Sequence, residues 1–93
     1  MQQRTEFVQE RVVQAIAQVL NRDRASIAPH TDLIEELGAD SLDALTITLV
    51  LEQEFGIKVN DEEVDGFRSP AQISAAVIEH LATLSSVRVA ARK

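Results

Sequence analysis

The sequence predicts a small all-α protein, a four-helix bundle with three longer helices and one short third helix. Apolar residues recur at spacings of three and four along the longer segments, which is typical of amphipathic helices. No segment alternates apolar and polar residues over the length of a strand, and all three glycines lie at segment edges. With 93 residues, 45% of them hydrophobic, the chain can form one core. We therefore expect a single domain at residues 1–84, followed by a basic, flexible tail at residues 85–93.

The first helix is expected over Glu6–Leu20, with Thr5 as its N-cap. Its apolar stripe consists of Val8, Val12, Ile16, Val19 and Leu20. Residues 21–31 lose this period, so they are expected to form a long loop. Residues 32–37 are expected to add one helical turn, which Gly38 ends.

The second helix is expected over Ser41–Phe55, since nothing in this segment breaks a helix. Asp40 is in the N-cap position and Asp43 follows three residues later, as in an acidic variant of the capping box. Gly56 follows Phe55 as the natural C-terminal stop.

The short third helix is expected over residues 61–64, closed by Gly66. The last helix has a stronger start signal, because Ser69 can cap it, Pro70 suits its first position and Gln72 suits its third. Its apolar stripe, Ile73, Val77, Leu81 and Leu84, predicts an end near residue 84.

Negative charge is concentrated in the middle of the chain, which has a net charge of −6. Residues 30–67 contain eleven acidic side chains and a single basic one, Lys58. Residues 68–93 contain four basic side chains and one acidic side chain. The acidic region fits an ordinary solvated surface, and it fits equally a docking face for basic partners.

The composition also excludes several classes of function. Nucleic-acid binding needs clustered Lys and Arg to contact phosphates, so no nucleic-acid partner is expected. The absence of Cys excludes disulfides, thiolate metal sites and a cysteine nucleophile. No apolar run approaches the length of a membrane span, and no secretory signal is evident. We expect a cytoplasmic monomer that does not insert into membranes.

Ser41 stands at the first position of the second helix, directly after a turn that contains glycine. A hydroxyl at this position is expected to be exposed, and a helix N-terminus favours an attached anion. Position alone also fits an ordinary polar residue in a first helical turn.

The segment Glu36-Leu37-Gly38-Ala39-Asp40-Ser41-Leu42-Asp43 resembles the phosphopantetheine attachment signature of acyl carrier proteins, and the resemblance covers roughly residues 4–84. It implies a non-catalytic carrier in which a transferase that uses coenzyme A attaches 4′-phosphopantetheine to Ser41. The thiol of that arm would hold acyl groups as thioesters. The implied partners are the phosphopantetheinyl transferase and acyl-transferring enzymes of fatty-acid or polyketide synthesis that have basic docking patches.

The resemblance also implies two sets of residues around the second helix. The partner-docking set is Asp40, Leu42, Asp43, Leu45, Thr46, Leu49, Glu52 and Gln53. The set that would line an acyl pocket is Ala44, Ile47, Thr48, Leu51, Val59, Val64, Phe67, Ile73 and Val77, although plain core packing also explains it. Thr46 and Gln53 depart from the family pattern, which commonly has acids there, so a carrier for a dedicated pathway stays an alternative.

The sequence does not favour a hydrolase or a calcium-binding protein. A serine hydrolase would need a His and an acid placed beside the serine, but His30 is in a loop and His80 is on the last helix. A calcium loop starting at Asp61 would need Glu at its twelfth position, where the chain has Gln72, so no metal site is expected. Polyketide, lipid-modification, peptidyl and D-alanyl carriers remain alternatives, as does a protein-interaction module.

Overall fold

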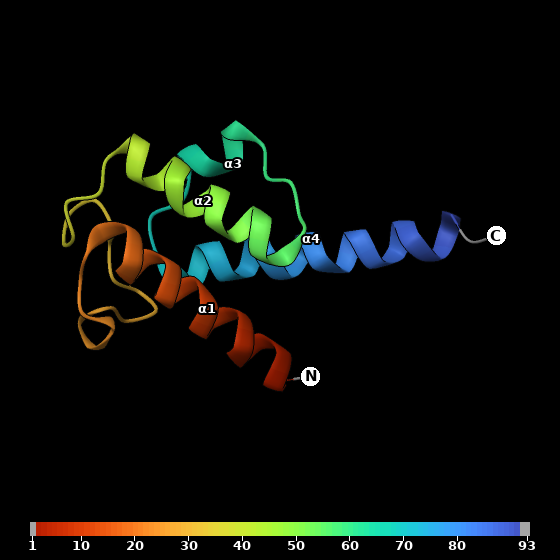
Figure 1. The fold of residues 1–93 in the computed structure, drawn as a ribbon, viewed down its shortest axis with the longest axis horizontal. Helices are drawn as coiled ribbons and strands as arrows, with labels where there is room; N and C mark the ends of the chain where they lie inside the picture. The colour runs from red at the N-terminus through yellow and green to blue at the C-terminus, as the bar shows by residue number, and fades with distance from the viewer. Residues whose placement is uncertain (1, 92–93) are drawn as a thin grey trace.

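The computed structural model describes the backbone of residues 2–91 and the side chains of residues 5–83, and this part of the chain is helical without strands (Figure 1). Its elements are α1 (Gln2–Leu20), the 3₁₀ helix η1 (Arg24–Ser26), α2 (Ser41–Phe55), α3 (Asp61–Asp65) and α4 (Pro70–Ala91). The predicted all-α bundle with a short third helix is therefore confirmed. None of the helices between Gln2 and Ala91 combines the length and the apolar character that a bilayer crossing requires.

The first helix begins earlier than predicted. α1 starts at Gln2, so Thr5 lies inside the helix and is not its N-cap. The physical reason is that Gln and Arg are good helix formers and nothing ahead of Thr5 stops the helix. At the other end, Asn21 adopts a positive φ of 56° and leads the chain into the long loop.

The turn expected over residues 32–37 is closed by hydrogen bonds but is not a regular helix. The N–H of Glu36 donates to the carbonyl of Asp32 at 2.9 Å, and the N–H of Gly38 donates to the carbonyl of Ile34 at 3.1 Å. The Asp32 side chain also accepts from the N–H groups of Ile34 and Glu35. Such side-chain bonds compete with helical backbone bonds, which explains the difference.

α2 has the predicted bounds, because both of its end signals are local. Asp40 and Asp43 form the expected reciprocal capping box. Gly56 caps the other end in the left-handed conformation, with φ 67°, where a Cβ would be strained.

α3 is one residue longer than predicted, and α4 starts at Pro70 as predicted. The Ser69 hydroxyl accepts from the N–H of Gln72 at 3.3 Å, and the Gln72 side chain accepts from the N–H of Ser69 at 3.2 Å. The helix continues to Ala91, past the end predicted near residue 84, because no Gly or Pro interrupts it. Mobility of the segment 85–93 stays a prediction.

The core is aliphatic and lies between α1, α2 and α4. α1 packs against both α2 and α4, while α3 packs against α2. The C-terminal part of α4 extends beyond the other helices (Figure 1). The most deeply buried side chains include Val12, Ile16, Ile47, Leu51, Ile73 and Val77. Phe7 and Phe55 add an edge-on contact, with ring centroids 6.4 Å apart.

Candidate functional site

Ser41 is exposed at the first position of α2. The N–H of Asp43 donates to the Asp40 carboxylate at 2.8 Å, and the N–H of Asp40 donates to the Asp43 carboxylate at 3.2 Å. These two bonds fix the backbone on either side of Ser41. Because a helix start presents N–H groups without helical partners, an anion attached at Ser41 is favoured.

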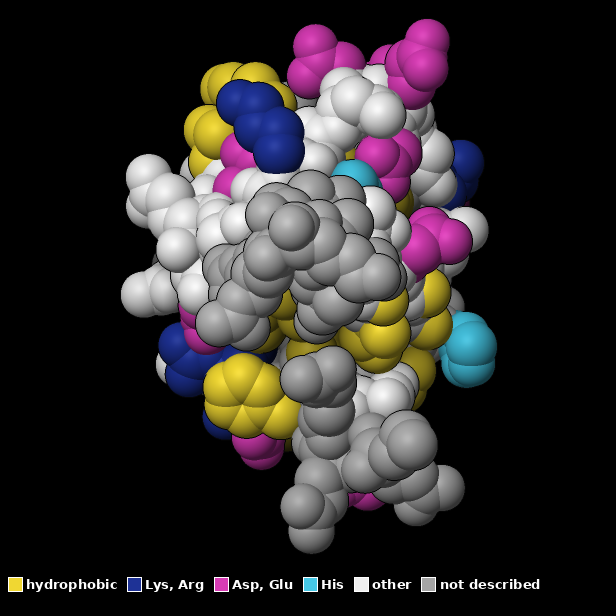
Figure 2. Space-filling view, turned by 90° about the vertical axis from the view of Figure 1, so that its right-hand side faces the viewer, with side chains coloured by type: hydrophobic (Ala, Val, Ile, Leu, Met, Phe, Trp, Pro, Cys, Tyr) yellow, Lys and Arg dark blue, Asp and Glu magenta, His cyan; other side chains and the backbone are white. Residues whose placement is uncertain are grey.

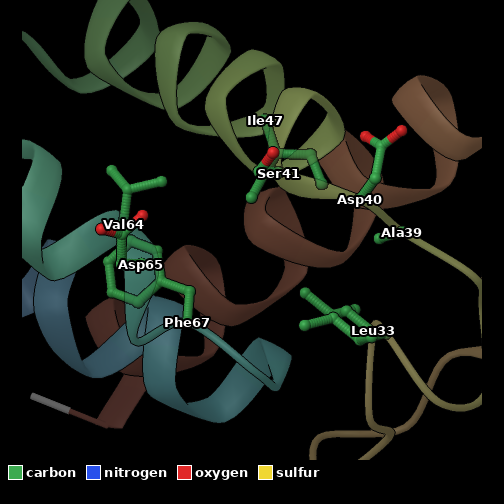
Figure 3. A pocket seen from close by; sticks show the side chains of 10 residues that line it. Leu33, Ala39, Asp40, Ser41, Ile47, Val64, Asp65 and Phe67 are labelled. Carbon is green, nitrogen blue, oxygen red and sulfur yellow. The ribbon is translucent and has the colours of Figure 1, made fainter.

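An apolar cavity of about 110 Å³ lies beside Ser41 (Figure 3). It is enclosed by the start of α2, the segment that precedes it, the end of α3 and the residue Phe67 that follows α3. Its apolar lining is Leu33, Ile34, Ala39, Ala44, Ile47, Val64 and Phe67, and its polar lining is Asp40, Ser41 and Asp65. The Ser41 side chain and an apolar hollow are thus neighbours.

Four residues of the predicted acyl pocket, Ala44, Ile47, Val64 and Phe67, are brought together in this lining. The other predicted members, Thr48, Leu51, Val59, Ile73 and Val77, are buried in the core and do not line it. The reason is that the cavity meets only the first turns of α2, and that Val59, Ile73 and Val77 lie on other segments of the bundle. The Thr48 hydroxyl donates to the Ala44 carbonyl at 2.8 Å, as a buried helical threonine commonly does.

The sequence patterns missed Leu33, Ile34, Ala39 and Asp65 as pocket residues. Leu33 is 2% exposed and belongs to the core as well as to the cavity wall. The available signal was the pair of apolar residues Leu33 and Ile34 just ahead of the attachment motif, but only the folded loop turns them toward Ser41.

The predicted docking face is largely open to solvent. Leu42, Leu45 and Leu49 are 68%, 41% and 49% exposed, and their spacing of three and four residues places them on one face of α2. Thr46 and Gln53 are also exposed. A shallow second hollow runs between Leu42 and Leu45 on α2 and the residues Asp61, Val64 and Asp65 of α3. In Figure 2, acidic side chains lie along the top of the molecule, at the height of α3 in Figure 1.

Glu52, another residue predicted to dock partners, also makes a contact that stabilises the fold. Its side chain is half-buried, and its carboxylate accepts from the N–H of Val59 at 2.7 Å. This bond joins the last turns of α2 to the connection that leads into α3. Glu52 therefore has a structural contact that the sequence pattern does not reveal.

The walls of the cavity are tied together by a contact between distant segments. The N–H of Leu33 donates to the Arg68 carbonyl at 2.8 Å, and the Arg68 guanidinium pairs with Asp32 at 3.2 Å. The N–H of Glu35 is the main cause that lowers the pKa of Asp32 from its ordinary value. Burial opposes this effect, whereas the N–H of Ile34 and the charge of Arg68 support it.

The two histidines take no part in this arrangement. His80 lies 3.0 Å from the Glu63 carboxylate, where it links α4 to α3, and His30 is exposed in the long loop. Within the described side chains, His, Asp and Glu residues nowhere gather into a group of three or more that could hold a metal ion.

Comparison with known proteins agrees with this geometry. Residues 10–77 match the protein family described as "Phosphopantetheine attachment site". An acyl carrier protein of Rickettsia typhi is 32% identical over 69 residues, which cover 74% of this chain and 80% of that protein. An acyl carrier protein of Helicobacter pylori is 38% identical over 56 residues, covering 60% of this chain and 72% of that protein.

The fold is also shared with a solved structure. The crystal structure of an acyl carrier protein from Thermotoga maritima matches 86% of this chain and 93% of its own, with a TM-score of 0.74 and 22% identity. The family match includes Ser41 and the whole cavity lining. The chain therefore belongs to the acyl carrier protein family, whose members are carriers rather than catalysts and whose attachment domain takes 4′-phosphopantetheine.

Proposed function

We propose that this protein carries acyl intermediates as thioesters on a 4′-phosphopantetheine arm attached to Ser41, and that it delivers them to enzymes of fatty-acid or related lipid biosynthesis. The observation that carries the proposal is the exposed Ser41 hydroxyl at a capped helix start, within the matched attachment domain and beside an apolar cavity. The relatives named acyl carrier protein support the same function.

The residues around Ser41 fit the group that the family attaches. Its phosphodiester is an anion, and the N-terminus of α2 favours an anion by about 0.3–1 kcal/mol at an exposed site. Exposure of the side chain lets a transferase reach the hydroxyl. The neighbouring cavity offers apolar surface to an acyl chain.

Attachment forms one bond to the Ser41 oxygen. That oxygen bonds to the phosphorus that bears pantetheine in coenzyme A, and the pyrophosphate bond breaks. Adenosine 3′,5′-bisphosphate leaves, and the hydroxyl proton passes to the transferase. When attached, the group supplies the thiol that holds the acyl chain, and its flexible tether raises the local concentration of that chain at a partner's active site.

Docking would use the exposed leucines of α2 and the acidic side chains around them. Leu42, Leu45 and Leu49 supply apolar contacts, and the carboxylates of α2 and α3 attract basic surfaces from a distance. Long-range attraction speeds encounters, and a small contact area keeps each complex short-lived. Rapid exchange suits a carrier that must visit several enzymes in turn.

Intact mass measurement tests the proposal directly. The protein is incubated with coenzyme A and a broad-specificity phosphopantetheinyl transferase, and we expect the mass of one phosphopantetheine to be added. Ser41→Ala should gain nothing, whereas the matched control Ser26→Ala, in the exposed η1, should load like the wild type. An unmodified wild type, or an equal gain by Ser41→Ala, would contradict the assignment.

A second candidate is a carrier dedicated to polyketide synthesis or lipid modification. It is favoured by Thr46 and Gln53, which leave two exposed positions of the docking face neutral. The two candidates are distinguished by the rate at which acyltransferases charge the loaded protein. Transferases from each kind of pathway are tested with malonyl and other acyl groups. Faster charging by fatty-acid enzymes supports the first.

A further inference from the structure

We propose that Arg22 is a positioning residue for the loading of Ser41: its guanidinium holds the turn that presents Ser41 to the phosphopantetheinyl transferase. That turn, residues 32–39, is called the attachment turn below. The inference rests on the proposed function, because it concerns the step in which Ser41 receives its arm. It gives a role in that step to a side chain of the long loop, outside the attachment motif and the docking face.

The end of α1 fixes where Arg22 lies. α1 ends at Leu20, Asn21 follows with a φ of 56°, and the N–H of Arg22 donates to the Ala17 carbonyl at 2.9 Å. A left-handed residue followed by such a bond is the Schellman ending of a helix, which sets the direction in which the chain leaves it. The end of α1 and the start of α2 lie at the same end of the bundle (Figure 1). Arg22 thus has a defined backbone position near the segment that leads into α2.

From this position Arg22 reaches the attachment turn. Its Nη2 donates to the Leu37 carbonyl at 3.1 Å, across a separation of 15 residues, and the bond is partly buried. The Leu37 side chain is buried in the core, so the guanidinium binds a well-anchored part of the backbone. A charged donor that is partly shielded from water makes a stronger bond than two neutral exposed groups.

The place of Leu37 in the chain decides what this bond controls. Leu37 directly precedes Gly38, whose φ of 72° begins the step into α2. The N–H of Gly38 donates to the Ile34 carbonyl at 3.1 Å, and the N–H of Ala39 donates to the Leu33 carbonyl at 2.9 Å. These two bonds close the attachment turn on itself, and they do not join it to other segments.

Two hydrogen bonds from other segments hold the attachment turn, one near each end. Near its start, the N–H of Leu33 donates to the Arg68 carbonyl at 2.8 Å. Near its end, Arg22 holds Leu37, which is four residues before Ser41. Without the Arg22 bond, the end that leads to Ser41 would be free to adopt more arrangements, while the start would stay fixed.

The expected consequence is kinetic. A transferase must bind the attachment turn in one arrangement, and its apparent affinity falls in proportion to the fraction of the carrier that has this arrangement. The bound complex still reacts at the same rate. Loss of the Arg22 bond should therefore raise the KM for the carrier by about 3–10-fold and leave kcat unchanged.

Three variants isolate the bond. Arg22→Met keeps an unbranched side chain but removes the donor and the charge, whereas Arg22→Lys keeps a charged donor. Arg24→Met is the matched control, because it removes the same charge from the same loop, and Arg24 pairs with Glu10 on α1 at 3.5 Å instead of contacting the attachment turn. With coenzyme A saturating and the carrier varied, we expect the raised KM for Arg22→Met, a partial return for Arg22→Lys and wild-type values for Arg24→Met.

Hydrogen exchange on the unmodified protein provides a readout that a purely global effect on stability would not give. The amides of Gly38 and Ala39 should exchange faster in Arg22→Met than in the wild type, because the attachment turn opens more often. The amide of Val59, which is bonded to Glu52 near the other end of α2, should keep its wild-type rate.

The outcomes separate this inference from the proposed function. If the wild type takes up no phosphopantetheine, the carrier assignment fails, and the inference fails with it. If the wild type loads but Arg22→Met and Arg24→Met have the same KM, only the role of Arg22 is overturned. Equal acceleration of exchange at Gly38 and at Val59 would also overturn it, because Arg22 would then stabilise the whole fold rather than the attachment turn.

Discussion

Replacing Glu52 by alanine should weaken the connection between α2 and α3. In the structure, the half-buried Glu52 carboxylate accepts the N–H of Val59 at 2.7 Å. Hydrogen bonds to charged groups contribute about 1.5–3 kcal/mol, and this one is reduced by its partial exposure, so we expect a loss of about 1–2 kcal/mol. In a domain of this size, such a loss lowers the Tm by roughly 5–15 °C.

Urea denaturation at pH 7 measures the loss, and hydrogen exchange locates it. The amide of Val59 should exchange faster in Glu52→Ala than in the wild type, because its acceptor is gone. Gln53→Ala is the control, since this neighbouring side chain is exposed and should change stability by less than about 0.5 kcal/mol. Equal stability of the two variants, with unchanged Val59 exchange, would refute the structural role of Glu52.

Two further predictions concern the turn before α2 and the docking face. Because hydrogen bonds and Arg68 lower the pKa of Asp32, its stabilising effect is complete above its unfolded-state pKa of about 3.9 and is lost as the pH falls through the lower folded-state value. Asp32→Asn should therefore be less stable than the wild type in urea at pH 7, and the difference should shrink below about pH 4; a constant difference would contradict this. Leu42→Ala should leave the Tm unchanged, because Leu42 is 68% exposed, and should lower kcat/KM for the phosphopantetheinyl transferase several-fold; Ala75→Gly, at an exposed position on α4, should lower stability without this kinetic effect.

The parts of the fold that the sequence predicted well have local causes. α2 begins and ends as expected, because Asp40, Asp43 and Gly56 act on their immediate neighbours. The errors at the outer ends of α1 and α4 have the opposite origin: where no Gly or Pro stops a helix, an apolar stripe indicates only its packed part. Both helices therefore continue beyond the residues that pack in the core.

The parts of the site that the sequence did not predict depend on contacts between distant segments. Leu33 and Ile34 reach the cavity because the loop is held by the bond from Leu33 to Arg68, and no pattern in the loop itself encodes that bond. The contact of Glu52 with Val59 likewise spans seven residues and a change of direction. Periodicity places side chains on a helix face, but it does not tell which of them a neighbouring loop will use.

The acidic middle of the chain has two kinds of carboxylate in the folded protein, those with structural contacts and those without. The charge pattern of the sequence does not distinguish the two kinds. Several hold the structure together through caps, turns or ion pairs, and these are Asp32, Glu36, Asp40, Asp43, Glu52, Glu54 and Glu63. A carboxylate that accepts an N–H keeps its charge, so the same groups also contribute to the field that a basic partner meets. Reversing the charge of Asp43 or Glu52 would consequently weaken the fold and the docking face together. The exposed Asp61 and Glu62 of α3 are the better positions for testing electrostatic docking, since neither takes part in the capping bond that the N–H of Glu63 donates to the Asn60 side chain.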